Sequence, residues 1–155
     1  MSDGSRYNVT VQTVAARPIA AVRARVPSGA VSASFKQYLD QVYAARAAGI
    51  QLDGQNIFVY RAVNEPNGVV DAEFGVGAKE PFTTVGSVVY SHVPSGEAAT
   101  ATHWGDYGKL GDAHEAVVSW CRANGRTLAG TSWEIYGHWT GKHADQRTDV
   151  FYLLG

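Results

Sequence analysis

The sequence has one cysteine, Cys121, and so little of several other features that whole classes of protein are disfavoured at once. A single thiol cannot form an internal disulfide, and the first residues contain no apolar stretch of the kind that a secretory signal needs, so we expect a cytoplasmic protein. No apolar run approaches the roughly 18 residues of a membrane-spanning helix. Basic and acidic residues nearly balance, 13 against 14, and the excess of positive charge that drives binding to nucleic acid is missing. We therefore expect neither a membrane nor a nucleic acid as partner.

Signals of a cofactor are also scarce. The five histidines include no His-x-x-x-His pair, and no cluster of cysteine and histidine has zinc-site spacing. The glycines within residues 75–77 and 137–141 match neither a phosphate-binding loop nor a dinucleotide fingerprint. We expect no metal and no nucleotide cofactor, and we expect Cys121 to be a packed thiol rather than a nucleophile.

Apolar and aromatic residues, in contrast, are plentiful. The 155 residues are 45% hydrophobic, which is enough for one core in a single domain spanning residues 1–155. Four Trp, eight Tyr and five Phe make 11% of the chain. Because Trp and Tyr carry a polar group that needs a partner when buried, so many of them indicate either a filled core or a ring-lined ligand site.

Periodicity predicts an α+β fold with two helices and eight strands. The helices are expected over residues 33–48 and 107–124, where apolar residues recur every three to four positions, and Gly49 and Gly125 stand where each helix should end. Asp106 is the expected N-cap of the second helix. The strands are expected in eight β-rich segments between turn residues, namely 9–14, 19–26, 57–63, 69–78, 85–93, 98–103, 133–139 and 148–153.

The order of these elements, ββαββ twice over, coincides with an internal repeat. A shift of 76 residues aligns 42–60 with 118–136 at seven identities in 19 positions, where chance gives roughly one or two. Before the helices the shift is 78, so the starts of the two helices differ by about two residues. We expect a duplicated unit, roughly residues 7–78 and 85–154, with pseudo-twofold symmetry and a ligand cleft where the halves meet.

Position 134 differs most between the two halves, because the repeat aligns Glu134 with Phe58. In a strand, Glu134 and Tyr136 point to the same face. That face is either the solvated side of an edge strand or part of a ring-lined site, and the aromatic equivalents Phe58 and Tyr60 favour the second interpretation. No lysine or arginine lies in this strand, so we expect a buried carboxylate without a basic partner, which would attract a lipophilic cation.

These residues resemble a known family. The turn at 94–96, the run His103-Trp-Gly-Asp-Tyr107 and the run Trp133-Glu-Ile-Tyr136 look like the motifs of the GyrI-like small-molecule-binding domain, which also serves as the effector domain of multidrug-responsive transcription activators. Asp106 stands where the family usually has proline, a change that a turn tolerates. The resemblance implies mostly antiparallel strands around an aromatic-lined cleft, in which Glu134 attracts cationic drugs. About six residues precede the first expected strand, so we expect a stand-alone domain without a DNA-binding segment.

Three functions stay open at this point. The preferred one is a non-enzymatic binder of lipophilic, often cationic or aromatic, small molecules, with a role in antibiotic resistance. The second is a hydrolase of electrophilic cyclopropane-containing toxins, in which Glu134 activates a water while Tyr136 or Tyr107 donates a proton. The third is an inhibitor protein that interacts with gyrase.

The expected ligand site combines the glutamate with seven aromatic residues. Trp104 and Tyr107 either build the turn before the second helix or overhang the ligand. Edge strands would allow two copies of the chain to pair as a homodimer. The full set of expected ligand-binding residues is Glu134, Tyr136, Phe58, Tyr60, Tyr90, Trp104, Tyr107 and Trp139.

Overall fold

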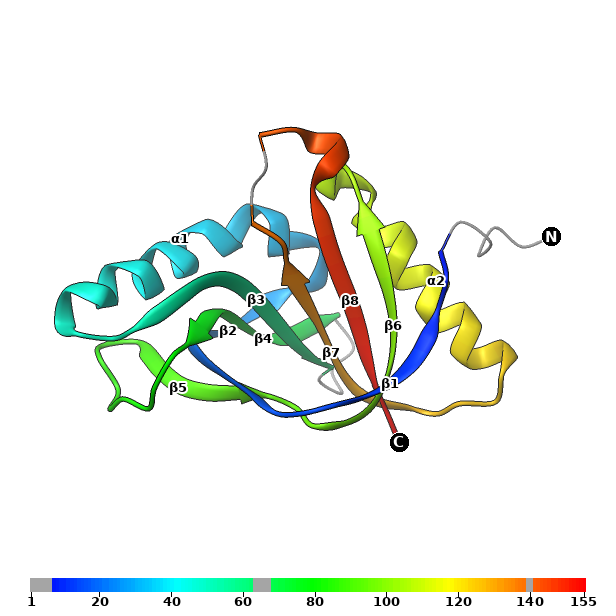
Figure 1. The fold of residues 1–155 in the computed structure, drawn as a ribbon. Coiled ribbons are helices and arrows are strands. Elements are labelled where there is room, and N and C mark those ends of the chain that lie inside the picture. The colour runs from blue at the N-terminus through cyan, green and yellow to red at the C-terminus, as the bar shows by residue number, and fades with distance from the viewer. Residues whose placement is uncertain (1–6, 63–67, 139–140) are drawn as a thin grey trace. The chain divides into compact units, whose positions relative to one another are not determined.

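The computed structural model describes residues 7–62, 68–138 and 141–155. The chain forms two compact units, which we call the α1 unit (residues 16–93) and the α2 unit (residues 1–15 and 94–155) after their helices. Each unit has four antiparallel strands with one helix packed on the sheet (Figure 1). The expected α+β class, with eight antiparallel strands and two helices, is confirmed.

The α1 unit has the strand order β3-β4-β2-β5, and α1 packs on β2 and β4. The helix continues as a short 3-10 turn, η3 (Ala45–Ala48), and ends at Gly49, whose φ of 98° only glycine adopts readily. A second 3-10 turn, η2 (Ser28–Ala30), precedes the helix. The main elements are β2 (Arg17–Pro27), α1 (Val31–Ala44), β3 (Leu52–Ala62), β4 (Val69–Ala78) and β5 (Val88–Val93).

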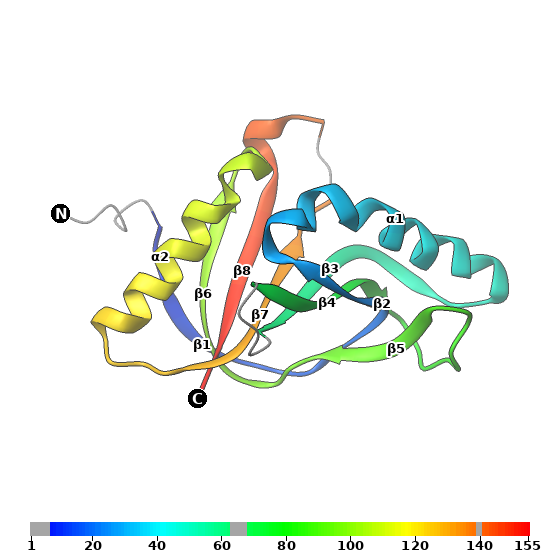
Figure 2. The same cartoon turned by 180° about the vertical axis from the view of Figure 1, so that it is seen from behind.

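The α2 unit has the equivalent order β7-β8-β6-β1, and α2 packs on β6 and β8 (Figure 2). Asp106 caps the 3-10 turn η4 (Tyr107–Lys109) that leads into α2, because its carboxylate accepts a hydrogen bond of 2.9 Å from the Gly108 amide. The main elements are β1 (Thr10–Val14), β6 (Gly96–Trp104), α2 (Leu110–Ala123), β7 (Leu128–Tyr136), the 3-10 turn η5 (His143–Asp145) and β8 (Arg147–Leu154).

The two units share a backbone irregularity at equivalent positions. The pairing register shifts between Leu52 and Asn56 in β3 and between Leu128 and Ser132 in β7. Each boundary of the shift in β7 lies 76 residues after the corresponding boundary in β3. In each strand four steps along the chain match two on the partner, so two extra residues are accommodated, and irregularities of this bulge type increase the local twist of a strand. They explain why β3 and β7 begin five residues earlier than sequence periodicity indicates, since a bulge interrupts the alternation on which the prediction depends.

Each unit takes its edge strand from the other sequence repeat. Strand β1 precedes β2 in the sequence but pairs with β6, whereas β5 precedes β6 but pairs with β2. The order ββαββ is therefore correct along the chain, but each compact unit exchanges its first strand with the other. Sequence periodicity contains no information on this exchange, because the alternation of a strand indicates which of its faces is buried but not which strand it pairs with.

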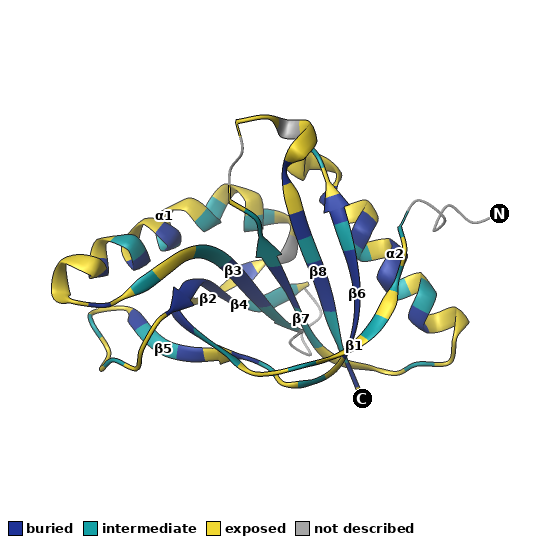
Figure 3. Ribbon diagram, in the orientation of Figure 1, coloured by how far each residue is buried: buried dark blue, intermediate teal, exposed yellow. Residues whose placement is uncertain are grey.

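Burial is concentrated on the strands and on the sheet-facing side of each helix (Figure 3). In the α2 unit the core between helix and sheet consists largely of small and aliphatic residues, among them Val117 and Val150, which are fully buried. On the opposite face of that sheet Trp133 is 1% exposed and stacks on Phe151 at 5.3 Å. No helix in the described part of the chain is long and apolar enough to cross a bilayer.

Candidate functional site

Glu134 lies in β7, on the face of the sheet that α2 covers. Its cross-strand neighbour is Val150, a member of the core beneath α2, and its neighbour in sequence, Trp133, points to the opposite face. The residue is 5% exposed. The interpretation of this face as a solvated polar one is therefore wrong, and the expected burial of the carboxylate is observed.

Two short hydrogen bonds hold the carboxylate. The Tyr136 hydroxyl donates to Oε1 at 2.6 Å, and Nε2 of His114 lies 2.6 Å from Oε2. Because a carboxylate can only accept, Nε2 is the protonated nitrogen, and Nδ1 of a neutral ring accepts from the Tyr152 hydroxyl at 2.8 Å. The result is a continuous chain of hydrogen bonds from Tyr152 through His114 and Glu134 to Tyr136, which we call the tyrosine–histidine–glutamate cluster.

The expectation that Glu134 has no basic residue beside it is wrong, since His114 is in direct contact. Lysine and arginine are missing from the strand itself, but the partner is a histidine that comes from α2. A signal was present in the sequence, because His114 interrupts the otherwise apolar stripe of Leu110, Val117 and Cys121 with an imidazole, which is strongly polar. A polar residue in a buried helical stripe needs a hydrogen-bonding partner, and a carboxylate in an aromatic strand is a suitable one.

The cluster perturbs the acidity of one of its own phenols, that of Tyr152. Burial raises the pKa of Tyr152 to about 12, and the negative charge of Glu134 adds to the increase, although a hydrogen bond with Ser132 opposes it. Tyr152 is therefore a neutral phenol at physiological pH, and its hydroxyl can donate a hydrogen bond to Nδ1 of a neutral His114 ring. Burial also raises the pKa of Tyr107.

Aromatic rings extend the cluster toward the surface. Tyr107 packs edge to face on Tyr136, with 5.5 Å between the ring centroids. Tyr107 is also exposed to solvent, with 45% of the residue accessible. Trp104 is 59% exposed, and the Arg147 guanidinium lies 5.7 Å from its ring centre. The structure thus brings Glu134, Tyr136 and Tyr107 together and places Trp104 on the surface.

The remaining expected residues lie in the α1 unit or outside the described residues. Phe58 is 4% exposed in the core under α1, and Tyr60 is half-buried on the same strand. Tyr90 is half-buried and meets His92 edge to face at 5.0 Å. Trp139 lies outside the described residues. The participation of these four residues in a ligand site stays a prediction.

A comparison of equivalent positions shows what is special about the α2 unit. In the α1 unit the strand residue Phe58 lies 5.6 Å from a helix residue, Phe35, between ring centroids. In the α2 unit the equivalent strand residue is Glu134, and its helix contact is His114. An apolar pair between helix and sheet in one unit is thus a hydrogen-bonded polar pair in the other.

Among the described residues of the α2 unit, two further buried polar groups have no hydrogen-bond partner. Thr148, the cross-strand neighbour of Tyr136, is fully buried, and its hydroxyl has no hydrogen-bond partner among the described residues, nor has Oε1 of Gln146. Such groups are uncommon in folded proteins and increase the polarity next to the cluster. Among the residues described, no three or more His, Cys, Asp or Glu side chains are grouped so that they could hold a metal ion. Cys121 is 1% exposed, and burial raises the pKa of its thiol, as expected of a packed residue.

Solved structures with this fold come from several kinds of protein. The crystal structure of the EcmrR C-terminal domain aligns with a TM-score of 0.78 at 21% identity and covers 96% of this chain and 98% of that one. In the EcmrR–DNA complex the alignment covers 57% of the EcmrR chain. SAV2435 bound to tetraphenylphosphonium aligns with a TM-score of 0.71 at 9% identity, covering 96% and 94% of the two chains. A hydrolase from Listeria innocua aligns with a TM-score of 0.53 at 9% identity, covering 95% and 91%.

These identities are low, so the neighbours establish the fold alone, and no curated protein matches the sequence. The sequence family is established separately. The family model of the GyrI-like small molecule binding domain matches residues 7–152, which is nearly the whole chain. The chain therefore belongs to the family of GyrI-like small-molecule-binding domains.

Proposed function

We propose that this domain binds lipophilic, often cationic or aromatic, small molecules at the tyrosine–histidine–glutamate cluster. The observation that carries the proposal is the buried carboxylate of Glu134, which receives hydrogen bonds from a phenol and an imidazole. A phenol has no charge, and the imidazole of His114 is charged only when both of its nitrogens are protonated. A cationic ligand would therefore find a negative group in a poorly hydrated setting, where its attraction is stronger than in water.

The surrounding rings would supply the other part of the affinity. Tyr136 and Tyr107 present faces and edges that can stack on a planar or ring-bearing ligand and attract its positive charge. Most of the binding free energy would come from burial of apolar area, at about 25 cal/mol per Å², and the carboxylate would add a preference for positive charge. A site of this type selects for charge and apolar area rather than for one shape, and so accepts many ligands. The structural neighbour whose ligand is tetraphenylphosphonium provides a suitable cationic probe.

The test is a titration that separates charge from apolar burial. Tetraphenylphosphonium and rhodamine 6G are the cationic probes, and Nile red is a neutral probe of similar apolar character. For Glu134→Gln we expect the affinity for the cations to fall about 10- to 100-fold, equivalent to about 1.4 to 2.8 kcal/mol, with little change for Nile red. Glu115→Gln is the matched control, because Glu115 is exposed on α2 next to His114 and its substitution changes the net charge equally. Equal losses for cationic and neutral probes would show that Glu134 is only structural.

A second candidate function, hydrolysis of electrophilic cyclopropane-containing compounds, has support from the geometry of the same cluster. In such a step a water oxygen would bond to a ring carbon as the strained C–C bond breaks, and Glu134 would accept a proton of that water at a remaining lone pair. The Tyr136 hydroxyl, 2.6 Å from Oε1 of Glu134, would donate its proton to the atom that receives the electron pair of the broken bond. A structural neighbour is a hydrolase. Incubation with such compounds followed by mass spectrometry would detect addition of water. Binding without turnover across several of them would leave the binding function and exclude hydrolysis of this class.

A further inference from the structure

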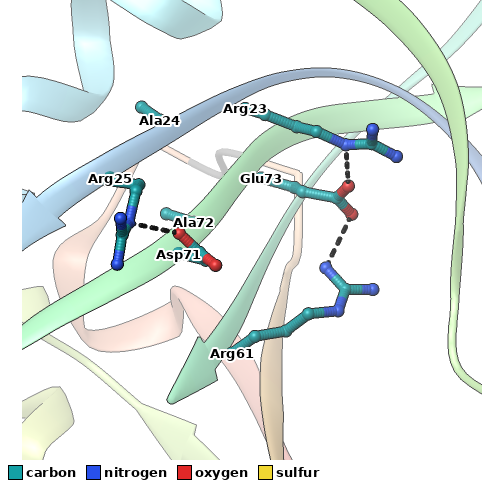
Figure 4. Close-up of a pocket in the computed structure, with 7 residues that line it drawn as sticks. All are labelled: Arg23, Ala24, Arg25, Arg61, Asp71, Ala72 and Glu73. Carbon is teal, nitrogen blue, oxygen red and sulfur yellow. Dashed lines mark hydrogen bonds and ion pairs between the residues drawn. The ribbon is translucent and has the colours of Figure 1, made fainter. Parts of the chain in front are cut away.

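A cavity of about 490 Å³ lies in the α1 unit, among strands β2, β3 and β4. Three arginines and two acidic residues contribute to its lining, together with two alanines (Figure 4). We call it the arginine cavity. All of its lining residues belong to the α1 unit, and none belongs to the tyrosine–histidine–glutamate cluster of the α2 unit.

The strand register explains how the charged groups meet. Arg23 stands opposite Glu73 and Arg25 opposite Asp71 in the β2–β4 pair, and Arg61 of β3 stands opposite Asp71 from the other side. Since side chains alternate along a strand, these five residues share one face of the sheet. The arrangement therefore follows from three neighbouring strands that each contribute charged residues to the same patch.

Glu73 is the buried residue around which this patch is organised. It is 3% exposed and pairs with Arg23 at 2.7 Å and with Arg61 at 3.1 Å, while Ser91 donates to both carboxylate oxygens. Figure 4 shows the two guanidiniums reaching Glu73 from different strands. Arg25 pairs separately with Asp71 at 3.1 Å. Three guanidiniums against two carboxylates leave one net positive charge in the lining of the cavity.

The two arginines on Glu73 keep most of their donors available. A guanidinium has five N–H groups, and the contact with Glu73 uses Nε of Arg23 and one terminal nitrogen of Arg61. Their side chains are 64% and 39% exposed, whereas that of Glu73 is 4% exposed. The carboxylate thus contacts one nitrogen of each guanidinium, and both arginine side chains, which line the cavity, stay partly exposed. Planar forks fixed in this way match carboxylate and phosphate groups and lose little freedom on binding them.

A purely structural pair would need only one of these arginines. One guanidinium neutralises a buried carboxylate, and a second one adds a charge that the protein must hydrate. The volume of the cavity falls within the range of sites for small molecules and is too small for a folded partner. We propose that the arginine cavity binds a small organic anion through its carboxylate or phosphate group, with Arg23 and Arg61 as the recognising residues and Glu73 as the positioning residue.

The experiment follows the side-chain Nε–Hε signals of the intact chain by NMR during titration with three probes of similar size. Phenyl phosphate and benzoate carry the two candidate groups, and benzyl alcohol is the neutral control. We expect saturable shifts of the Arg23 and Arg61 signals with at least one anion at up to about 10 mM, and none with benzyl alcohol. The stronger of the two anions identifies whether phosphate or carboxylate is preferred.

Charge-retaining variants distinguish recognition from general electrostatics. Arg61→Lys keeps the ion pair with buried Glu73 but removes the planar fork, so we expect the affinity to fall at least about fivefold. Arg17→Lys is the matched control, since Arg17 pairs with Asp53 at 2.8 Å elsewhere in the same unit. The affinity of this variant for the anion should stay within about twofold of the wild-type value. Backbone spectra check that each variant is folded. Absence of saturable shifts with both anions, an equal response to benzyl alcohol, or equal losses in the two variants would overturn the proposal.

Discussion

Replacement of Glu73 by glutamine should destabilise the protein strongly at neutral pH and much less in acid. The side chain of Glu73 is 4% exposed, and its carboxylate contacts two arginines. Glutamine removes the charge from both ion pairs, but its amide oxygen can still accept the hydrogen bond from Ser91. Loss of one partner from a buried ion pair costs about 3 to 5 kcal/mol when the other charge stays buried. Here Arg23 and Arg61 remain partly hydrated, with 64% and 39% of their side chains exposed. We therefore expect a decrease of about 2 to 3 kcal/mol in the free energy of unfolding at pH 7.

The pH dependence of this loss has a definite sign. Burial alone would raise the pKa of Glu73. The hydrogen bond from Arg23, the charge and hydrogen bond of Arg61, and the hydrogen bond from Ser91 together outweigh burial and hold the pKa below the ordinary value of 4.5. A lowered pKa in the folded state gives stability that is fully present above the pKa of the unfolded chain and is lost as the pH falls through the folded value. The difference between the wild-type protein and Glu73→Gln should therefore shrink as the pH falls below 4.5.

Urea unfolding followed by circular dichroism between pH 7 and pH 3 measures both quantities. Asp40→Asn is the control, because Asp40 pairs with Lys36 on the exposed surface of α1 and its loss should change stability little. A decrease below about 1 kcal/mol at pH 7, or a decrease that does not change with pH, would refute the description of Glu73 as a buried, doubly paired carboxylate.

The remaining predictions concern the cluster and the backbone. The pKa of Tyr152 is raised from 10.0 to about 12, so its contribution to the free energy of unfolding is fully present below pH 10 and is lost as the pH rises toward 12. Urea unfolding at pH 9 and pH 11.5 should therefore show a smaller loss of stability at the higher pH for Tyr152→Phe than for the wild-type protein. Gly75→Ala should cost about 1 to 3 kcal/mol in unfolding experiments, because its Cβ would lie 3.0 Å from the backbone oxygen of the paired strand, whereas Gly111→Ala on α2 has open space and should stabilise by up to about 1 kcal/mol. A double-mutant cycle with His114→Leu and Glu134→Leu should give a coupling energy of about 1 to 3 kcal/mol, and additive effects would show that the hydrogen bond of 2.6 Å contributes nothing.

Much of the fold could be predicted because local patterns determine it. The helices end where Gly49 and Gly125 adopt positive φ, and β4 spans residues 69–78 as its pattern predicts. The prediction was least accurate at the bulges of β3 and β7, where alternation is interrupted, and it gave no information on the exchange of β1 and β5 between units. Long-range pairing depends on tertiary packing, which a local pattern does not contain.

The candidate site could be predicted in part for the same reason. Glu134 and Tyr136 could be identified because they share one strand and because the repeat provides a comparison: Glu134 replaces Phe58, whereas Tyr136 matches Tyr60. Their partner His114 was not identified, because it comes from a helix 20 residues earlier. Glu73 gave no signal of its own in the sequence, since its partners Arg23, Arg61 and Ser91 lie on three other strands. Contacts within one element follow from spacing, whereas contacts between elements require the packing of one on another.

The difference between the two units bears on why the polar pair exists. At the helix–sheet contact of the α1 unit, Phe35 and Phe58 bury apolar area at no cost in desolvation. At the equivalent strand position of the α2 unit, His114 and Glu134 must give up hydration, and well-packed apolar residues in place of a buried polar pair are often equally or more stable. Since the α1 unit demonstrates that this fold accepts the apolar solution, stability alone does not account for the polar one. The free energy that the α2 unit spends on desolvating a carboxylate is explained most simply if that carboxylate meets a ligand.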